Sequence, residues 1–214
     1  MDARRTGFVG TLSTASTATV SSRTIGGVTC SIHDYGDGDA TAKKDAIAEA
    51  VQILTDKGYP LPNTITFHLS NLAEGWNKAP TEAFARAKDG SVSTEVFLGV
   101  NAVYGTGAAP GSPQEGIAHK VHQYNLGDYT TAVCVHELGH VLHDVESKDF
   151  FWGAADQPMD GGDAETAYKQ ISGYSSVNKK EVVAEVFCAH NMGLKFHGKE
   201  VQALYDKFQG PTLR

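Results

Sequence analysis

Two histidines four positions apart in an apolar segment constrain this chain more than any other feature. Residues 130–145 read TTAVCVHELGHVLHDV, and the two histidines are His136 and His140. The apolar spacing predicts a helix, on which positions four apart differ by about 40° around the axis and about 6 Å along it. Both imidazoles can therefore face one metal ion, and such a pair suits zinc. Glu137 projects beside that ion, where its carboxylate can accept a proton from water.

Two neighbours of this pair carry further expectations. Gly139 lies inside the predicted helix, where glycine costs about 1 kcal/mol relative to alanine. That cost makes sense if another backbone packs closely at this point. His143 lies near His136 on the helical wheel but about 10 Å further along the axis, so the three imidazoles cannot converge on one ion. We expect His143 to support a ligand histidine from behind or to fill the core.

A second predicted helix, over residues 178–192, supplies carboxylates. Glu181 and Glu185 are four apart and share one face of a mostly apolar helix. Two such carboxylates need a cation or strong donors nearby. The simplest assignment makes Glu181 the third zinc ligand, while Glu185 accepts a hydrogen bond from the far nitrogen of a ligand histidine. The alternative is a solvated acidic stripe beside Lys179 and Lys180.

The remaining pattern predicts an α+β fold, because strands gather in the first half and helices in the second. We expect strands at 28–33, 64–69 and 92–100 with an edge strand at 18–22, and helices at 41–57, 81–88, 130–145, 178–192 and 199–208. Residues 1–27 are expected to form a flexible segment rich in Ser, Thr and Gly. Residues 28–214 are expected to form one folded domain, with an N-lobe over about 28–145 and a helical lobe over about 146–214.

Composition excludes several classes of protein. The chain has 214 residues and a formal net charge of −7, which argues against a nucleic-acid or anionic-membrane binder. No apolar run approaches the roughly 20 residues of a membrane span. The three cysteines cannot form a disulfide framework, so we expect free buried thiols. Residues 1–27 lack the apolar block of a secretory signal, and we expect a monomer.

The motifs resemble those of the anthrax lethal factor and Pro-Pro endopeptidase family of zinc metallopeptidases, of the gluzincin type. HELGH at 136–140 is followed by Tyr174 and then by EVVAE at 181–185. The resemblance implies a zincin-like fold, with a small mixed sheet, an active-site helix and a mainly helical C-terminal lobe. It also implies that His136, His140 and Glu181 hold one Zn²⁺ ion, that Glu137 is the general base, and that Tyr174 assists the oxyanion. Val182 and Val183 stand where the family often has paired aromatics, which leaves substrate preference open.

The same resemblance implies a protein or peptide substrate. We expect the substrate strand to pair with the edge strand at 92–100. Four aromatic residues are candidates for the rim that contacts the substrate: Trp76, Tyr104, Phe151 and Trp152. Family members are often exported, so we expect a secreted toxin or effector, with a cytoplasmic location as the alternative.

Other readings stay open at this point. The segment at 162–168 is faintly similar to the aspzincin signature, which would make Glu165 the third ligand. The same helix could serve a zinc-dependent hydrolase that does not act on peptides. The chain could also be a catalytically inert zinc-binding module, although structural zinc sites are usually closed cages that include cysteine.

Overall fold

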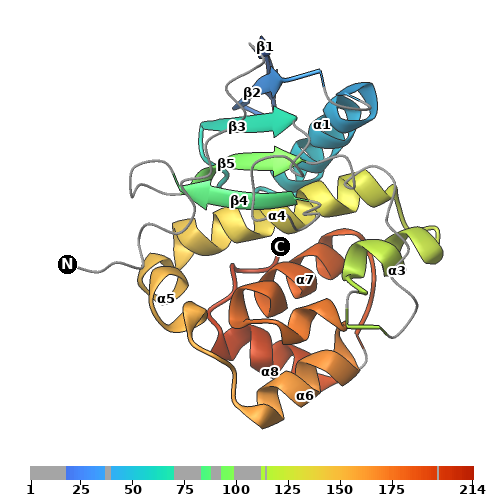
Figure 1. Cartoon of the computed structure of the whole chain (residues 1–214), viewed down its shortest axis with the longest axis vertical. Coiled ribbons are helices and arrows are strands. Elements are labelled where there is room, and N and C mark those ends of the chain that lie inside the picture. Colours follow the sequence, from blue (N-terminus) through green and yellow to red (C-terminus); the bar gives the residue numbers. More distant parts are fainter. Residues whose placement is uncertain are drawn as a thin grey trace.

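The sheet, with one helix beside it, occupies one half of the molecule and most of the other helices occupy the other half, which gives an α+β fold with a small mixed sheet (Figure 1). The computed structural model describes residues 18–36, 40–69, 83–87, 93–98, 112–113, 115–196 and 198–214. The strands are β1 (Thr19–Ile25), β2 (Val28–Asp34), β3 (Thr64–Leu69), β4 (Ala83–Ala87) and β5 (Ser93–Leu98). The helices are α1 (Ala40–Asp56), α3 (Ile117–Gln123), α4 (Tyr129–Glu146), α5 (Lys148–Trp152), α6 (Gly161–Gln170), α7 (Lys179–Asn191) and α8 (Lys199–Lys207), with 3-10 turns η1 (Ala154–Asp156) and η2 (Tyr174–Ser176).

The sheet has the strand order β1-β2-β3-β5-β4. Strands β2, β3 and β5 run parallel, whereas β1 and β4 are antiparallel to their neighbours. β1 and β2 form a hairpin whose turn is Gly26-Gly27, with φ of 55° and 88°. Two consecutive positive φ values are what a tight hairpin turn requires, which explains the glycine pair. The first strand therefore reaches Ile25, further than the predicted 18–22.

Two predictions about the sheet are wrong. The segment 81–88 was expected to be a helix, but it holds strand β4. The strand expected at the edge, 92–100, is β5, which lies between β3 and β4, so β4 is the edge strand on this side of the sheet and β1 is the edge strand on the other. Alanine has the highest helix propensity, but propensity is a weak determinant of structure, and in β4 the pairing with β5 overrides it.

Helix α4 lies between the sheet and the C-terminal helices (Figure 1). Every residue from Tyr129 to Asp144 is buried, as expected for a helix covered on all sides. Asp128 begins the helix, because its carboxylate accepts hydrogen bonds from the backbone N–H groups of Thr130 and Thr131. The helix with the histidine pair is thus the buried central helix of the fold.

The helices predicted over 41–57, 130–145, 178–192 and 199–208 are confirmed within one residue at each end. Helices α3, α5 and α6 were not predicted. Cys30, Cys134 and Cys188 are free and buried, as expected. None of the described helices combines the length and apolarity needed to cross a membrane.

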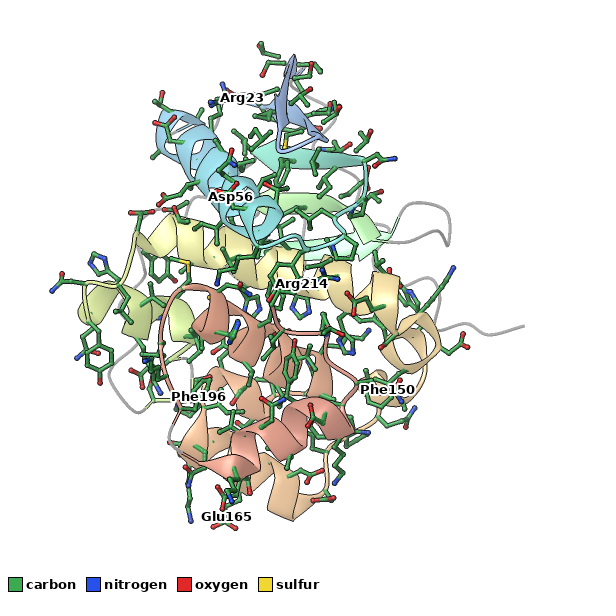
Figure 2. The ribbon with its side chains drawn as sticks, turned by 180° about the vertical axis from the view of Figure 1, so that it is seen from behind. Arg23, Asp56, Phe150, Glu165, Phe196 and Arg214 are labelled. Carbon is green, nitrogen blue, oxygen red and sulfur yellow. The ribbon has the colours of Figure 1, made fainter. Side chains whose placement is uncertain are left out.

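The segment 211–214 ties the two halves together on the side opposite the view of Figure 1, where Figure 2 shows Arg214 near the middle of the molecule. The backbone N–H of Arg214 donates to the hydroxyl of Tyr59, which follows α1. The backbone N–H of Thr212 donates to the carboxylate of Glu146 at the end of α4. This segment therefore contacts both halves at once.

Candidate metal centre

The centre is built where α4 and α7 cross. A Cβ placed on Gly139 of α4 would lie 3.4 Å from Cα of Ala184 on α7. The two backbones therefore approach as closely as the glycine at 139 predicted. The thiol of Cys188 on α7 also donates to the backbone carbonyl of Ala132 on α4, 3.2 Å away. This crossing brings residues 45 positions apart in sequence into contact.

Three side chains converge at the crossing. Nε2 of His136 lies 3.1 Å from Oε2 of Glu181, and Nε2 of His140 lies 3.5 Å from the same oxygen. One ligand atom from each residue lies within 4.8 Å of the other two, and among the described residues these three are the group that meets this condition. The histidines are buried and Glu181 is partly buried.

These separations fit a zinc ion. Zinc takes nitrogen and oxygen ligands at about 2.0–2.2 Å in a tetrahedron, which places neighbouring ligand atoms about 3.3–3.6 Å apart. Of the two distances to Glu181, 3.5 Å lies within that range and 3.1 Å lies just below it. Two imidazoles and one carboxylate also leave a fourth position for water or substrate.

Protonation in the metal-free centre follows from the same contacts. Burial opposes a charge on His136, but its hydrogen bonds to Glu181 and Glu185 outweigh burial and raise its pKa well above the ordinary 6.5. Burial would raise the pKa of Glu181, yet the charges and hydrogen bonds of His140 and His136 lower it well below 4.5. The metal-free centre therefore holds a carboxylate and an imidazolium, and a cation can replace the proton.

Glu185 holds the other nitrogen of His136, as expected from its position. Its Oε1 lies 2.9 Å from Nδ1 of His136. Its Oε2 accepts hydrogen bonds from the backbone N–H of Ile117 at 2.7 Å and from the hydroxyl of Ser172 at 2.6 Å. Glu185 is 2% exposed, and these donors explain how a buried carboxylate is tolerated.

Glu137 and Tyr174 flank the three ligand candidates. Glu137 follows His136 on α4 and is 5% exposed. Tyr174 lies in η2, and its ring centroid is 6.2 Å from that of His136. Tyr174 is 39% exposed, so its side chain lies at the surface beside the buried imidazole.

His143 and Glu165 have partners other than the three ligand candidates. Nε2 of His143 lies 3.0 Å from the carbonyl oxygen of Phe208, so of its two expected roles the structure supports packing. Glu165 is exposed on α6 and pairs with Lys169 on the same helix. Figure 2 shows Glu165 at the end of the molecule remote from α4. The structure therefore brings Glu181, and not Glu165, to the two histidines.

The aromatic residues expected at the substrate rim differ in their exposure. Phe151 is 4% exposed and packs edge-on against His140, so it lies beneath the surface and not on an open rim. Trp152 is 36% exposed, and its indole N–H donates to Asp144. Nζ of Lys180 lies 4.1 Å from the ring centroid of Phe151 and covers both aromatics. Trp76 and Tyr104 lie outside the described residues.

The two donors to Glu185 were not predicted from sequence. The Ile117 donor is a backbone N–H at the start of α3, so no side-chain pattern reveals it. Helix α3 itself was missed, and with it the unsatisfied N–H groups that every helix start presents to an acceptor. Ser172 lies in a serine-rich segment in which no single hydroxyl stands out.

Comparisons with protein-family models, with curated proteins and with solved structures gave no match. The interpretation of the centre therefore depends on its geometry.

Proposed function

We propose that this chain is a zinc-dependent endopeptidase with a zincin-like fold. The observation that carries the proposal is the convergence of His136, His140 and Glu181 at distances suited to one zinc ion. Glu137, between the two histidines on α4, adds the carboxylate that a hydrolytic centre needs. The site would hold a single Zn²⁺ ion on these three side chains.

Each flanking residue has a defined task in this proposal. A bound zinc ion would supply a Lewis acid that polarises the peptide carbonyl and lowers the pKa of water. Glu137 would accept the proton of the attacking water and pass it to the nitrogen of the leaving amine. The hydroxyl of Tyr174 would donate a hydrogen bond to the oxyanion as it develops. Glu185 would keep His136 in position throughout.

This fold offers an edge strand with which an extended peptide could pair. Strand β4 is one of the two edge strands of the sheet, and it contacts α4, the helix that carries the histidines. A substrate strand could add to this edge through main-chain hydrogen bonds. The exposed Trp152 is available for side-chain contacts. We propose protein or peptide substrates, and a secreted or exported effector remains our proposal for the protein's place of action.

The alternatives share the same centre. A zinc hydrolase that acts on esters or other amides would use the same ligands and the same base. An inert zinc-binding module would need no base beside the ligands, and the buried Glu137 favours hydrolysis over that reading.

The decisive experiment measures zinc content and cleavage of a diverse peptide library together. We expect one zinc per chain and cleavage by the wild type. Glu137→Gln should keep zinc and lose turnover by a factor of about 10² or more, since a positioned general base contributes about 10²–10⁴. Glu165→Gln is the matched control, because Glu165 is an exposed glutamate on α6, and this variant should behave as wild type.

The possible outcomes separate the alternatives. Zinc with ester hydrolysis and no peptide cleavage would favour the non-peptidase hydrolase. Zinc with no turnover on any substrate class would favour the inert module. A chain that binds no zinc would end all three readings.

A further inference from the structure

A chain of buried hydrogen bonds runs behind His136, from the turn that carries Tyr174 to the carboxylate of Glu185. The backbone N–H of Ser175 donates to Oγ of Ser172 at 3.0 Å, and that hydroxyl donates to Oε2 of Glu185 at 2.6 Å. Ser172 is 1% exposed and Ser175 is completely buried. Because the Ser172 hydroxyl receives one hydrogen bond and gives another, it has a fixed direction.

The donors around Glu185 make its two oxygens unequal. A backbone N–H can only donate, so the contact of Ile117 requires an acceptor at Oε2. Oε1 then faces Nδ1 of His136 at 2.9 Å. A carboxylate can only accept, so Nδ1 must carry the hydrogen. When the ring gives up one proton, as metal binding requires, the lone pair is therefore left on Nε2, the nitrogen that faces Glu181.

The backbone around these buried hydrogen bonds is closely packed. A Cβ on Gly116 would lie 3.3 Å from Oε1 of Glu185, and a Cβ on Gly173 would lie 2.0 Å from the carbonyl oxygen of Ser112. The backbone N–H of Tyr174 donates to the carbonyl of Glu115, two residues before Ile117. The residues at 112–113 and 115–117 are therefore packed closely against the segment 172–176 as well as against Glu185.

We infer that Ser172, together with the backbone N–H of Ile117, is a positioning group that fixes the tautomer and orientation of His136 and holds the Tyr174 turn in register with it. The inference rests on the proposed function, because it assigns these groups to the zinc centre. The ligand side of His136 and the exposed tyrosine are then two ends of one hydrogen-bonded unit.

The first test compares two buried serines of the same turn. Ser172→Ala removes the donor to Glu185. Ser175→Ala removes a hydroxyl that donates to the backbone carbonyls of Ala167 and Ser172, accepts from the backbone N–H of Ser172 at 3.3 Å, and has no hydrogen bond to Glu185. We expect Ser172→Ala to weaken zinc affinity about tenfold, the lower end for groups that support a ligand. Ser175→Ala should stay within about twofold of wild type in zinc affinity, whatever it costs in stability.

A second variant reads the tautomer directly. In Glu185→Gln the Ile117 N–H still requires an acceptor, so the amide oxygen takes the Oε2 position and the amide NH₂ faces Nδ1 of His136. Nδ1 must then accept and Nε2 must carry the hydrogen, which blocks the metal. We expect this isosteric variant to lose about a hundredfold in zinc affinity and to bind zinc no better than Glu185→Ala. A purely structural role predicts the opposite order.

NMR of the histidine ring protons supplies a readout that needs neither zinc nor turnover. The metal-free wild type and Ser175→Ala should show a slowly exchanging, downfield Nδ1–H signal of His136, and Ser172→Ala should show faster exchange. Equal zinc affinities and equal proton exchange for the two serine variants would overturn the inference. A wild type that binds no zinc but keeps the protected Nδ1–H would instead overturn the proposed function.

Discussion

The backbone of Gly139 on α4 lies directly against the side chain of Phe187 on α7, so that a Cβ at position 139 would be 3.0 Å from Cδ1 of Phe187. Phe187 is completely buried, and its ring also packs edge-on against Tyr59 with centroids 5.0 Å apart. The ring therefore has little freedom to move away. The distance between the histidine pair and Glu181 depends on this contact.

Gly139→Val should separate the two helices and distort the candidate metal centre. Overpacking in a well-filled core costs about 1–3 kcal/mol, and we expect a loss of that size in the free energy of unfolding, measured by urea denaturation. Zinc affinity should fall in the same variant, because Glu181 moves with α7. The control is Gly161→Val at the start of α6, where no described heavy atom lies within 4 Å of an added Cβ. Equal midpoints of urea denaturation for the two variants would show that α4 and α7 are not tightly packed at Gly139.

Zinc binding near pH 7 should release about one proton. The carboxylates of Glu181 and Glu185 raise the pKa of His136 well above 6.5 against the effect of burial, so the metal-free ring is protonated on both nitrogens. Zinc requires the lone pair of Nε2 and must displace that proton. The apparent affinity should therefore rise about tenfold per pH unit until the raised pKa is reached. Calorimetry in buffers of different ionisation enthalpy measures the release, and a heat independent of buffer would contradict the prediction.

His143→Gln should make the fold less sensitive to acid without changing zinc affinity. Burial is the main reason that the pKa of His143 falls to about 3. A group with a lowered basic pKa stabilises the fold above its unfolded value of 6.5 and loses that contribution as the pH falls toward 3. Between pH 6.5 and 5 the free energy of unfolding of the wild type should fall by about 2 kcal/mol, and the glutamine variant should not show this fall. Urea denaturation of both proteins at pH 7 and pH 5 checks this, and parallel losses would count against it.

Much of the candidate centre could be predicted from sequence because its spacing is local. Residues four apart on a helix share a face, which places His136 with His140 and Glu181 with Glu185 regardless of the rest of the fold. The glycine at 139 similarly indicated a close crossing before its partner helix was known. The partner of Glu185 at Ile117 could not be predicted, because a backbone N–H has no signature in sequence.

The sheet was harder to predict for a related reason. A short edge strand such as β4 is fixed by pairing with β5 and not by its own composition, which is rich in alanine. The strand order, with β5 inserted between β3 and β4, depends on contacts distant in sequence. Helix α1, by contrast, shows its buried stripe of Ala46, Ala50 and Leu54 directly in the spacing of its residues.

Tyr59→Phe should loosen the junction between the two halves of the molecule. The Tyr59 hydroxyl accepts hydrogen bonds from the backbone N–H of Arg214 at 3.0 Å and from Nδ2 of Asn191 at 3.3 Å. Leaving these donors without their acceptor should cost about 1–2 kcal/mol, with faster amide exchange at Arg214. Tyr124→Phe is the control, because Tyr124 is 60% exposed. If both variants unfold at the same urea concentration, the hydroxyl of Tyr59 does not hold the junction.

The three buried thiols can report which part of the molecule opens to solvent. Cys30 lies on β2, whereas Cys134 and Cys188 lie on the two crossing helices. Burial raises the pKa of all three, to about 11 for Cys30, so the reactive thiolate is scarce in the closed molecule. An alkylating reagent can modify each sulfur only while its surroundings are open. The order in which the sulfurs are alkylated would therefore reveal whether the sheet or the helix crossing opens first.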